Sequence, residues 1–371
     1  MKLHCELDTI KKAILSLSRI TVKKEQSETL SCLFFIISKN KLTIRATNLS
    51  VGAEYKISIE TKDIEEEVTF SINAQNIQNI FSSLILDKNV KNIEIEITDN
   101  LVNFIYKKNK LHVKKQPTTD IPTLPDIREE SFTIDKATLK EGIQTVLSSA
   151  SKSDIKPELA SIFINQQAGK LVFVTTDTFR LTEYSVVTKK EYSFPSILIP
   201  SKNAQEIYKI LDDSTAVDVE VYPAKNQITF VTKDIFITSQ LINGLFPDYT
   251  KIIPTLKHGV TSFLKTDLMD VLKTLNPFMD IRNQVKMHIN SKTQEIEFYS
   301  KNDLLGEYNG SVTAKIVGDS FEVLVNKNFL EDILLKMPEN VTMVINQPQK
   351  PILIQSADNT EVLCLLMPMS Q

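Results

Sequence analysis

The fold of this chain is decided by the stretch Phe70-Ser-Ile-Asn-Ala-Gln-Asn-Ile-Gln-Asn-Ile-Phe81, which has two further copies in the sequence. These copies are Ile199-Pro-Ser-Lys-Asn-Ala-Gln-Glu-Ile-Tyr-Lys-Ile210 and Leu324-Val-Asn-Lys-Asn-Phe-Leu-Glu-Asp-Ile-Leu-Leu335. They recur about every 127 residues, far above the roughly 20 to 50 residues of solenoid and propeller repeats. Each repeat is therefore long enough to bury its own core. The sequence predicts three equivalent domains, at 1–125, 130–250 and 255–371, with proline-bearing stretches at the joins.

A second set of similar segments opens each predicted domain, at residues 5–17, 132–143 and 263–272. Each segment runs from a short extended piece through a capping residue into apolar positions three or four residues apart, which is typical of an amphipathic helix. The two sets together predict six helices, two in each domain. Their N-terminal caps are predicted to be Asp8, Asn73, Asp135, Ser201, Thr266 and Asn326.

Between these helices the sequence alternates between apolar and polar residues, as in Lys91-Asn-Ile-Glu-Ile-Glu-Ile-Thr98. A period of two is typical of half-buried antiparallel strands. The predicted fold class is therefore α+β. Each domain is expected to be a duplicated strand-helix-strands unit, with two helices packed on antiparallel sheets.

Charge and cysteine content restrict the function and the compartment. The net charge of −3 gives no general attraction to nucleic acid, so such binding requires a local group of Lys and Arg. Cys5, Cys32 and Cys364 are odd in number and widely spaced, and are predicted to be reduced and mostly buried. The sequence shows neither a membrane-spanning apolar run nor a signal-peptide core. We therefore expect a cytoplasmic protein without a membrane partner.

The sequence lacks the usual motifs of catalysis and metal binding. The eight glycines form neither a G-x-G-x-x-G turn nor a P-loop, and the four histidines lack the spacing of a metal site. No catalytic residue, metal or cofactor is expected. Ser149 and Lys152 match the S-x-x-K of penicillin-binding enzymes, although no K-T-G follows. A Ser/Lys hydrolase is therefore an alternative of a different class.

Basic residues gather on and beside the predicted helices, for example Lys11, Lys12 and Arg19 near the first and Lys136 and Lys140 near the third. If the three domains curve with their helices inward, these residues line a concave basic surface. Such a surface contacts phosphate oxygens of duplex DNA without reading the base sequence, and its affinity falls with salt. Six ordinary amphipathic helices with solvated lysines are the alternative, because charged helix faces are common.

Three stretches resemble the bacterial replicative sliding clamp, the beta subunit of DNA polymerase III. Thr176-Asp-Thr-Phe-Arg-Leu181 is similar to the family's T-D-G-H-R-L, and Gly244-Leu-Phe-Pro-Asp-Tyr249 to its G-x-F-P-D-Y. Leu366-Met-Pro-Met369 is similar to the family's C-terminal M-P-M. The resemblance extends over the whole chain and the three-domain layout.

The resemblance implies a non-enzymatic processivity clamp. Two chains close head to tail into a homodimeric ring around double-stranded DNA, and a separate ATP-driven clamp loader opens and closes the ring. The replicative polymerase and other clients dock short peptide motifs into a cleft between the second and third domains. A clamp-like scaffold that binds peptides but does not encircle DNA is the nearest alternative.

The resemblance also implies three sets of functional residues. The peptide cleft is expected to comprise Leu159, Thr176, Thr178, Phe179, Arg180, Leu181, Pro247, Ile252, Leu365, Met367, Pro368 and Met369. The DNA-binding residues are expected to be Arg19, Lys23, Lys24, Lys152, Lys156, Ser201 and Lys202. The dimer interface is expected to comprise Lys108, Lys110, Leu111, Val113, Phe278, Met279 and Glu307.

Residue chemistry fits the peptide cleft, with departures from the family. Met367 and Met369 are unbranched and polarizable, so they can adapt to different client side chains. Arg180 is expected to hold a peptide carbonyl or carboxylate. Thr178 and Phe179 replace the family's Gly-His pair and make the cleft edge bulkier and more apolar. Positions often basic in the family carry Gln75, Asn76 and Ser201, so a weaker grip on duplex DNA is expected.

Overall fold

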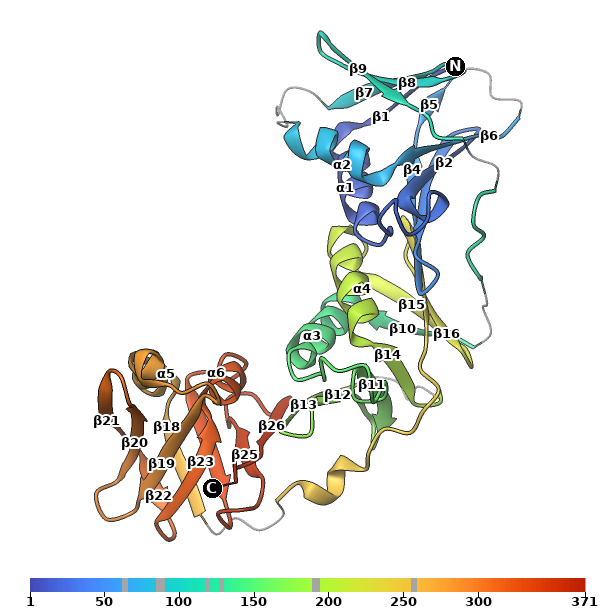
Figure 1. Cartoon of the computed structure of the whole chain (residues 1–371). Coiled ribbons are helices and arrows are strands. Elements are labelled where there is room, and N and C mark those ends of the chain that lie inside the picture. The colour runs from blue at the N-terminus through green and yellow to red at the C-terminus, as the bar shows by residue number, and fades with distance from the viewer. Residues whose placement is uncertain are drawn as a thin grey trace. The chain divides into compact units, whose positions relative to one another are not determined.

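The computed structural model describes residues 1–61, 66–84, 91–117, 120–126, 130–188, 194–254 and 259–370 (Figure 1). They form two compact units. Unit 1 contains Met1–Lys140 and Lys202–Leu241, and unit 2 contains Glu141–Ser201 and Ile242–Gln371. The middle of the chain contributes strands to both units.

Within the described residues, one order of elements, a strand, an α-helix and three strands, occurs six times (Figure 1). The first copy is β1 (Lys2–Glu6), α1 (Leu7–Ser18), β2 (Cys32–Ser38), β3 (Lys41–Thr47) and β4 (Val51–Ser58). The second is β6 (Val68–Asn73), α2 (Ala74–Ser83), β7 (Asn92–Ile97), β8 (Leu101–Tyr106) and β9 (Asn109–Lys114). The third is β10 (Phe132–Asp135), α3 (Lys136–Leu147), β11 (Ser161–Gln167), β12 (Lys170–Thr176) and β13 (Arg180–Val187).

The last three copies follow the same order. The fourth is β14 (Ile197–Pro200), α4 (Ser201–Asp213), β15 (Asp218–Pro223), β16 (Gln227–Val231) and β17 (Ile235–Gln240). The fifth is β18 (Gly259–Leu264), α5 (Lys265–Leu275), β19 (Gln284–Asn290), β20 (Glu295–Asn302) and β21 (Gly306–Thr313). The sixth is β23 (Phe321–Asn326), α6 (Lys327–Leu334), β24 (Asn340–Ile345), β25 (Ile352–Gln355) and β26 (Val362–Leu366). Two short strands, β5 (Glu60–Thr61) and β22 (Lys315–Val317), and three 3₁₀ turns, η1 (Thr29–Ser31), η2 (Tyr249–Ile252) and η3 (Asn276–Phe278), lie between them.

The strand before each helix pairs with the strands of the neighbouring copy. In the first third of the chain β1 pairs with β7, and β6 pairs with β2. The same exchange joins β10 to β15 and β14 to β11, and again β18 to β24 and β23 to β19. Because the exchange is the same in all three thirds, the predicted α+β fold with three equivalent, internally duplicated domains is confirmed. The exact domain boundaries stay a prediction.

The described strands form four antiparallel sheets, two in each unit. Unit 1 holds the sheets β5-β1-β7-β8-β9 and β10-β15-β16-β17-β4-β3-β2-β6. Unit 2 holds β14-β11-β12-β13-β26-β25-β24-β18-β22 and β21-β20-β19-β23. The strands β9 and β21 each end a sheet, and β13 pairs with β26 inside the nine-stranded sheet (Figure 1).

The helices bury one apolar stripe each, as their sequence period predicts. In α2 the stripe includes Ile77 and Phe81, and the Phe81 ring meets Phe104 of β8 edge to face with centroids 5.2 Å apart. In α5 the buried residues are Leu268, Leu272 and Leu275. This packing on a sheet is the main source of helix stability, since such short helices are marginal alone.

Half of the predicted helix caps are confirmed. Side chains of Asn73, Asp135 and Asn326 accept hydrogen bonds from N–H groups of the first helical turn. The predictions for Asp8, Ser201 and Thr266 are wrong.

Those three helices begin one or two residues earlier than a cap at these positions requires. Asp8 pairs with Lys12 in the first turn of α1, and Ser201 is the first residue of α4. The Thr266 N–H instead donates to the Glu339 carboxylate at 3.1 Å. In these three helices the first N–H is satisfied by a backbone carbonyl of the neighbouring copy, for example Leu7 N to Lys91 O at 2.8 Å.

All three cysteines are free and buried, as predicted. Burial raises the pKa of the Cys5 thiol to about 12. No helix among the described residues is both long and apolar enough to span a membrane. The same residues contain no cluster of His, Cys, Asp and Glu that is placed to hold a metal ion.

Candidate functional site

The antiparallel pair of β13 and β26 brings the three distinctive sequence stretches together in unit 2. Leu181 of the first stretch lies opposite Leu365, one residue before the last stretch. Both leucines belong to a buried cluster that also contains Tyr249, the final residue of the second stretch. Beyond β26 the chain stays close, because the Met367 N–H donates to the Phe179 carbonyl oxygen at 2.8 Å.

The turn between β12 and β13 is held by its own polar side chains. Asp177 Oδ1 accepts hydrogen bonds from the N–H groups of Phe179 at 3.0 Å and Arg180 at 2.9 Å. Thr176 Oγ1 accepts from the Thr178 N–H at 3.1 Å and donates to the Arg180 carbonyl at 2.7 Å. Within this turn Thr178 adopts a φ of +75°, which a β-branched residue rarely occupies. The turn therefore presents Phe179 outward from a strained backbone.

Arg180 is buried under this turn, and its donors face acceptors of its own chain. Nε donates to Asp177 Oδ2 at 3.1 Å, Nη2 donates to the Ser148 carbonyl at 2.6 Å, and Nη1 donates to the Asp332 carboxylate. The guanidinium also lies over the Phe329 ring, 4.5 Å from its centroid. This is the environment of a structural cation. It differs from the expectation that Arg180 holds a carbonyl or carboxylate of a bound peptide.

The residues expected in the peptide cleft fall into a buried set and an accessible set. The buried set lies beneath the surface and comprises Leu159, Thr176, Arg180, Leu181 and Leu365. The accessible set, which we name the apolar rim, comprises Thr178, Phe179, Pro247, Ile252, Met367, Pro368 and Met369. Phe179 is 59% exposed and Ile252 is 47% exposed. Accessible apolar side chains beside a rigid sheet are what an apolar peptide side chain needs for binding.

Sequence reasoning missed the contribution of α6 to this site. Phe329 lies 6.4 Å from Phe179 between ring centroids, with the planes inclined by 26°. Asp332 follows one helical turn later, and Lys336 Nζ lies 3.7 Å from its carboxylate. The spacing of 329 and 332 places these two residues on one face of a helix, which was the available signal in the sequence, and Lys336 follows just after the helix ends.

Lys336 is nearly enclosed, with 10% of its side chain exposed. Burial lowers its pKa, against the raising effect of the Asp332 carboxylate. Its Nζ also donates to Ser149 Oγ at 3.4 Å, and Ser149 Oγ lies 2.7 Å from Thr182 Oγ1. Ser149 is completely buried, whereas Lys152 is exposed, so the pair required for a Ser/Lys hydrolase is not assembled.

The residues expected to bind DNA are accessible. Arg19, Lys23, Lys24 and Lys202 of unit 1 and Lys152 and Lys156 of unit 2 are exposed, and Ser201 is half-buried. Lys24 forms a loose pair with Glu28 at 3.7 Å. Several other helix lysines have carboxylate partners, as Lys12 has with Asp8. Among the residues expected to bind DNA, most of the accessible positive charge therefore lies in the segments that follow α1 and α3.

The residues expected at the dimer interface lie on or beside two sheet-edge strands. In unit 1, Lys108 and Lys110 are exposed and Leu111 is half-buried, while Val113 is only 5% exposed and faces Val102. Lys110 pairs with a carboxylate oxygen of Glu96 at 3.0 Å. Val113 therefore belongs mainly to the core of its own unit.

In unit 2 the edge strand is β21, with Glu307 exposed near its start. Glu307 accepts a hydrogen bond from the Tyr299 hydroxyl at 3.1 Å. Phe278 packs near Tyr308 with ring centroids 5.8 Å apart, and the Asn302 side chain donates to the Met279 carbonyl. The apolar residues and the carboxylate thus lie at one end of the edge strand.

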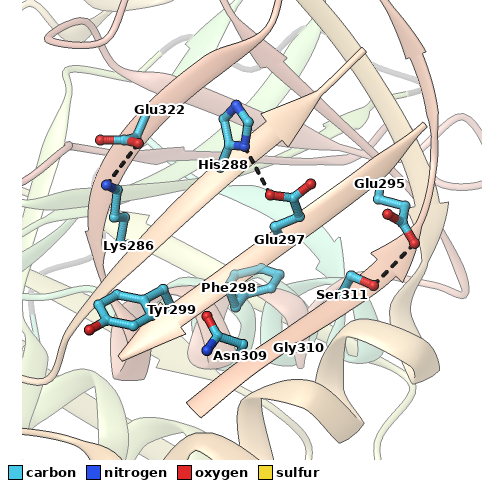
Figure 2. Close-up of a pocket in the computed structure, with 10 residues that line it drawn as sticks. All are labelled: Lys286, His288, Glu295, Glu297, Phe298, Tyr299, Asn309, Gly310, Ser311 and Glu322. Atoms are coloured by element: carbon cyan, nitrogen blue, oxygen red, sulfur yellow. Dashed lines mark hydrogen bonds and ion pairs between the residues drawn. The ribbon is translucent and has the colours of Figure 1, made fainter. Parts of the chain in front are cut away.

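The polar face of the same four-stranded sheet carries a shallow depression of about 600 Å³ (Figure 2). Figure 2 shows that its charged side chains are paired across the strands. Lys286 pairs with Glu322 at 2.9 Å, and His288 lies 3.0 Å from Glu297. We interpret this face as a solvated sheet surface, since its charges already have partners.

Comparison with known proteins identifies related families. Models of the DNA polymerase III beta subunit match in order along the chain: the N-terminal domain at 1–125, the central domain at 133–248 and the C-terminal domain at 250–370. The beta sliding clamp of Buchnera aphidicola subsp. Acyrthosiphon pisum is 24% identical over 379 residues, with 99% of each chain covered. That of Halalkalibacterium halodurans is 25% identical and covers 85% of this chain and 87% of its own length.

Solved structures show the same fold. The DNA polymerase III beta subunit of Thermotoga maritima superimposes with a TM-score of 0.91 at 21% identity, covering 100% of this chain and 99% of that one. The sliding clamp of Pseudomonas aeruginosa bound to griselimycin gives a TM-score of 0.90 at 19% identity, with both chains fully covered.

Proposed function

This chain belongs to the DNA polymerase III beta-subunit family of sliding clamps, and from that premise we propose that it is a non-enzymatic processivity clamp. Two copies close head to tail into a ring around duplex DNA in the cytoplasm. A clamp loader opens this ring, and the replicative polymerase and other clients bind through short peptide motifs. No cofactor takes part in this function.

The observation that carries the ring is that β9 and β21 each end a sheet. A free strand edge exposes unpaired N–H and C=O groups and is a template for pairing with another chain. Lys108 and Lys110 lie at one edge, and Glu307 lies at the other. The opposite charges favour pairing of unlike edges. Two different edges, each used twice, give a closed dimer with two-fold symmetry and leave neither edge free.

Duplex DNA is proposed to be retained by enclosure, with weak phosphate contacts. Arg19, Lys23, Lys152 and Lys156 are accessible and lie in short segments after helices. Contacts from such side chains to phosphates carry no sequence information, so the protein can slide along the duplex. Gln75 and Asn76 are both exposed on α2 and contribute no charge, which fits a shallow dependence of DNA affinity on salt.

Client peptides are proposed to bind across the apolar rim. Met367 and Met369 are partly exposed; the Met367 N–H donates to the Phe179 carbonyl and the Met369 N–H to the Leu324 carbonyl, and thioether side chains adapt to anchors of different shape. The buried cluster around Leu181, Tyr249 and Leu365 gives the rim a rigid base. A rigid base with adaptable side chains suits one site that serves several clients.

The solution mass tests the ring. Sedimentation equilibrium of the full chain is expected to give twice the chain mass of 42.0 kDa at micromolar concentration. A monomer at these concentrations contradicts the proposed edge pairing. A dimer that never remains on circular DNA supports instead the peptide-binding scaffold that does not encircle DNA.

A further inference from the structure

We propose that Asp332 is a positioning residue for the proposed client site. Through Arg180 it holds Phe179 and Phe329 in the arrangement that a client peptide meets. This inference rests on the proposed function, in which peptides bind across the apolar rim. It assigns a role to a carboxylate of α6 that does not itself belong to that rim.

Arg180 connects three elements that are distant in sequence. Its guanidinium donates to Asp177 in the β12–β13 turn, to the Ser148 carbonyl just after α3, and to Asp332 in α6. Only 9% of the Arg180 side chain is exposed. A guanidinium so shielded from water requires an acceptor for its charge, because an uncompensated buried charge is strongly destabilising. Asp332 supplies the carboxylate from α6 and thereby fixes the turn against that helix.

The aromatic rings are part of the same arrangement. Phe329 precedes Asp332 by one helical turn, so both side chains lie on the face of α6 that meets Arg180. The guanidinium lies over the Phe329 ring at 4.5 Å, and the Phe179 ring lies 6.4 Å from that ring. Loss of the Asp332 charge releases the guanidinium from α6 and thereby weakens the support for both rings, while its contacts with Asp177 and the Ser148 carbonyl remain.

Lys336 increases the dependence of this cluster on Asp332. Its Nζ lies 3.7 Å from the Asp332 carboxylate, and its side chain is 10% exposed. One carboxylate therefore serves two shielded cations. Among the described residues, its removal leaves Asp177 as the one acidic side chain in contact with Arg180, and leaves Lys336 with the Ser149 hydroxyl. We expect the turn and α6 to separate locally, while the buried sheet beneath them stays intact.

The test uses a single fluorescent reporter at the rim. The chain contains no tryptophan, so Phe179→Trp makes position 179 the sole indole in the full-length protein. Asp332→Asn removes the charge at nearly constant shape, and Arg180→Lys breaks the same contact from the other end. Asp270→Asn, at an exposed ion pair on α5 of the same unit, is the matched control.

Asp332→Asn and Arg180→Lys are each expected to raise the acrylamide quenching constant of the reporter about twofold and to lower its anisotropy. The double variant is expected to show the same quenching constant and anisotropy as each single variant, since the two substitutions break the same contact. Asp332→Glu is expected to keep the quenching constant and the anisotropy close to the parent values, and Asp270→Asn is expected to leave both unchanged. The proposal is overturned if Asp332→Asn lowers only the melting temperature and leaves quenching and anisotropy at the parent values.

Binding of griselimycin is measured separately, on the parent chain and on the Asp332 and Arg180 variants that keep Phe179. It bound one structurally similar clamp, and it serves here as the probe of the rim. A loosened reporter in the variants, with no binding even to the parent protein, supports the positioning role and counts against the rim as the client site. Binding to the parent with an unchanged reporter in the variants supports the client site and refutes the role of Asp332.

Discussion

Leu181 of β13 and Leu365 of β26 lie opposite each other in an antiparallel pair, and both are almost completely buried. This pair fixes the end of the chain in the nine-stranded sheet of unit 2. β26 ends at Leu366, and the Met367 N–H that follows donates to the Phe179 carbonyl. The C-terminal segment can therefore be removed without removing a strand.

Deletion of residues 367–371 is expected to abolish peptide binding and to leave the dimer intact. The deletion removes three residues of the apolar rim, but β26 ends at Leu366 and keeps its pairing. Calorimetric titration with griselimycin and sedimentation equilibrium measure the two properties. A deletion variant that sediments as a monomer contradicts the separation of the peptide site from the dimer interface.

Leu111→Asp is expected to have the opposite effect, giving a monomer that still binds griselimycin. A carboxylate in place of the half-buried Leu111 must be desolvated when the edge of β9 pairs with another chain. Gln205→Asp adds the same charge at an exposed position of α4 and is the control. An unchanged sedimentation coefficient for Leu111→Asp argues against β9 as the interface strand.

Thr178→Gly is expected to stabilise the protein by about 0.5–1 kcal/mol, since glycine accepts a positive φ without steric cost. Removing the strain of Thr178 at φ +75° stabilises the folded protein, and the extra entropy that glycine has in the unfolded chain reduces this gain. Thr274→Gly, in the regular helix α5, is expected to destabilise by about 0.3 kcal/mol. Urea unfolding midpoints of the two variants give the comparison. If both variants lose stability equally, Thr178 is not strained.

Tyr55→Phe is expected to raise the free energy of unfolding by roughly 1 kcal/mol at neutral pH. The Tyr55 hydroxyl is buried and has no hydrogen-bond partner among the described residues. Burial raises its pKa far above the ordinary value of 10.0, so above pH 10 only the unfolded state loses the proton. Stability of the parent therefore falls as pH rises through this range.

Tyr55→Phe lacks this titrating hydroxyl. The difference in free energy of unfolding between the variant and the parent is therefore expected to increase from pH 7 to pH 10.5. Urea unfolding at the two pH values provides the measurement. A difference that stays constant between them shows that Tyr55 does not titrate differently in the folded and unfolded protein.

The repeat and the helices could be predicted from sequence because each depends on local patterning. The starts of α1, α4 and α5, where the cap predictions were wrong, depend instead on the exchange of strands between neighbouring copies. The wrongly predicted cap Thr266 illustrates this, because Glu339 from the following copy accepts its N–H. A local pattern carries no information about which distant carbonyl or carboxylate will reach a helix start.

The candidate site shows the same limit. Leu181 and Leu365, which the resemblance of short motifs assigns to the cleft, share one buried cluster of unit 2, and the assignment of the other cleft residues stays a prediction. The role of Arg180 could not be assigned in this way, since its acceptors come from the β12–β13 turn, the end of α3 and α6. Burial and hydrogen bonding, rather than the motif itself, distinguish a structural arginine from one that binds a ligand.

Retention on DNA circles tests the central claim most directly. The protein is loaded onto a nicked circular plasmid by its clamp loader, separated from free protein by gel filtration, and followed before and after the plasmid is cut once. Enclosure predicts that the protein stays with the circle and is lost rapidly once ends are available. Loss from intact circles as fast as from linear DNA contradicts a ring that encircles the duplex.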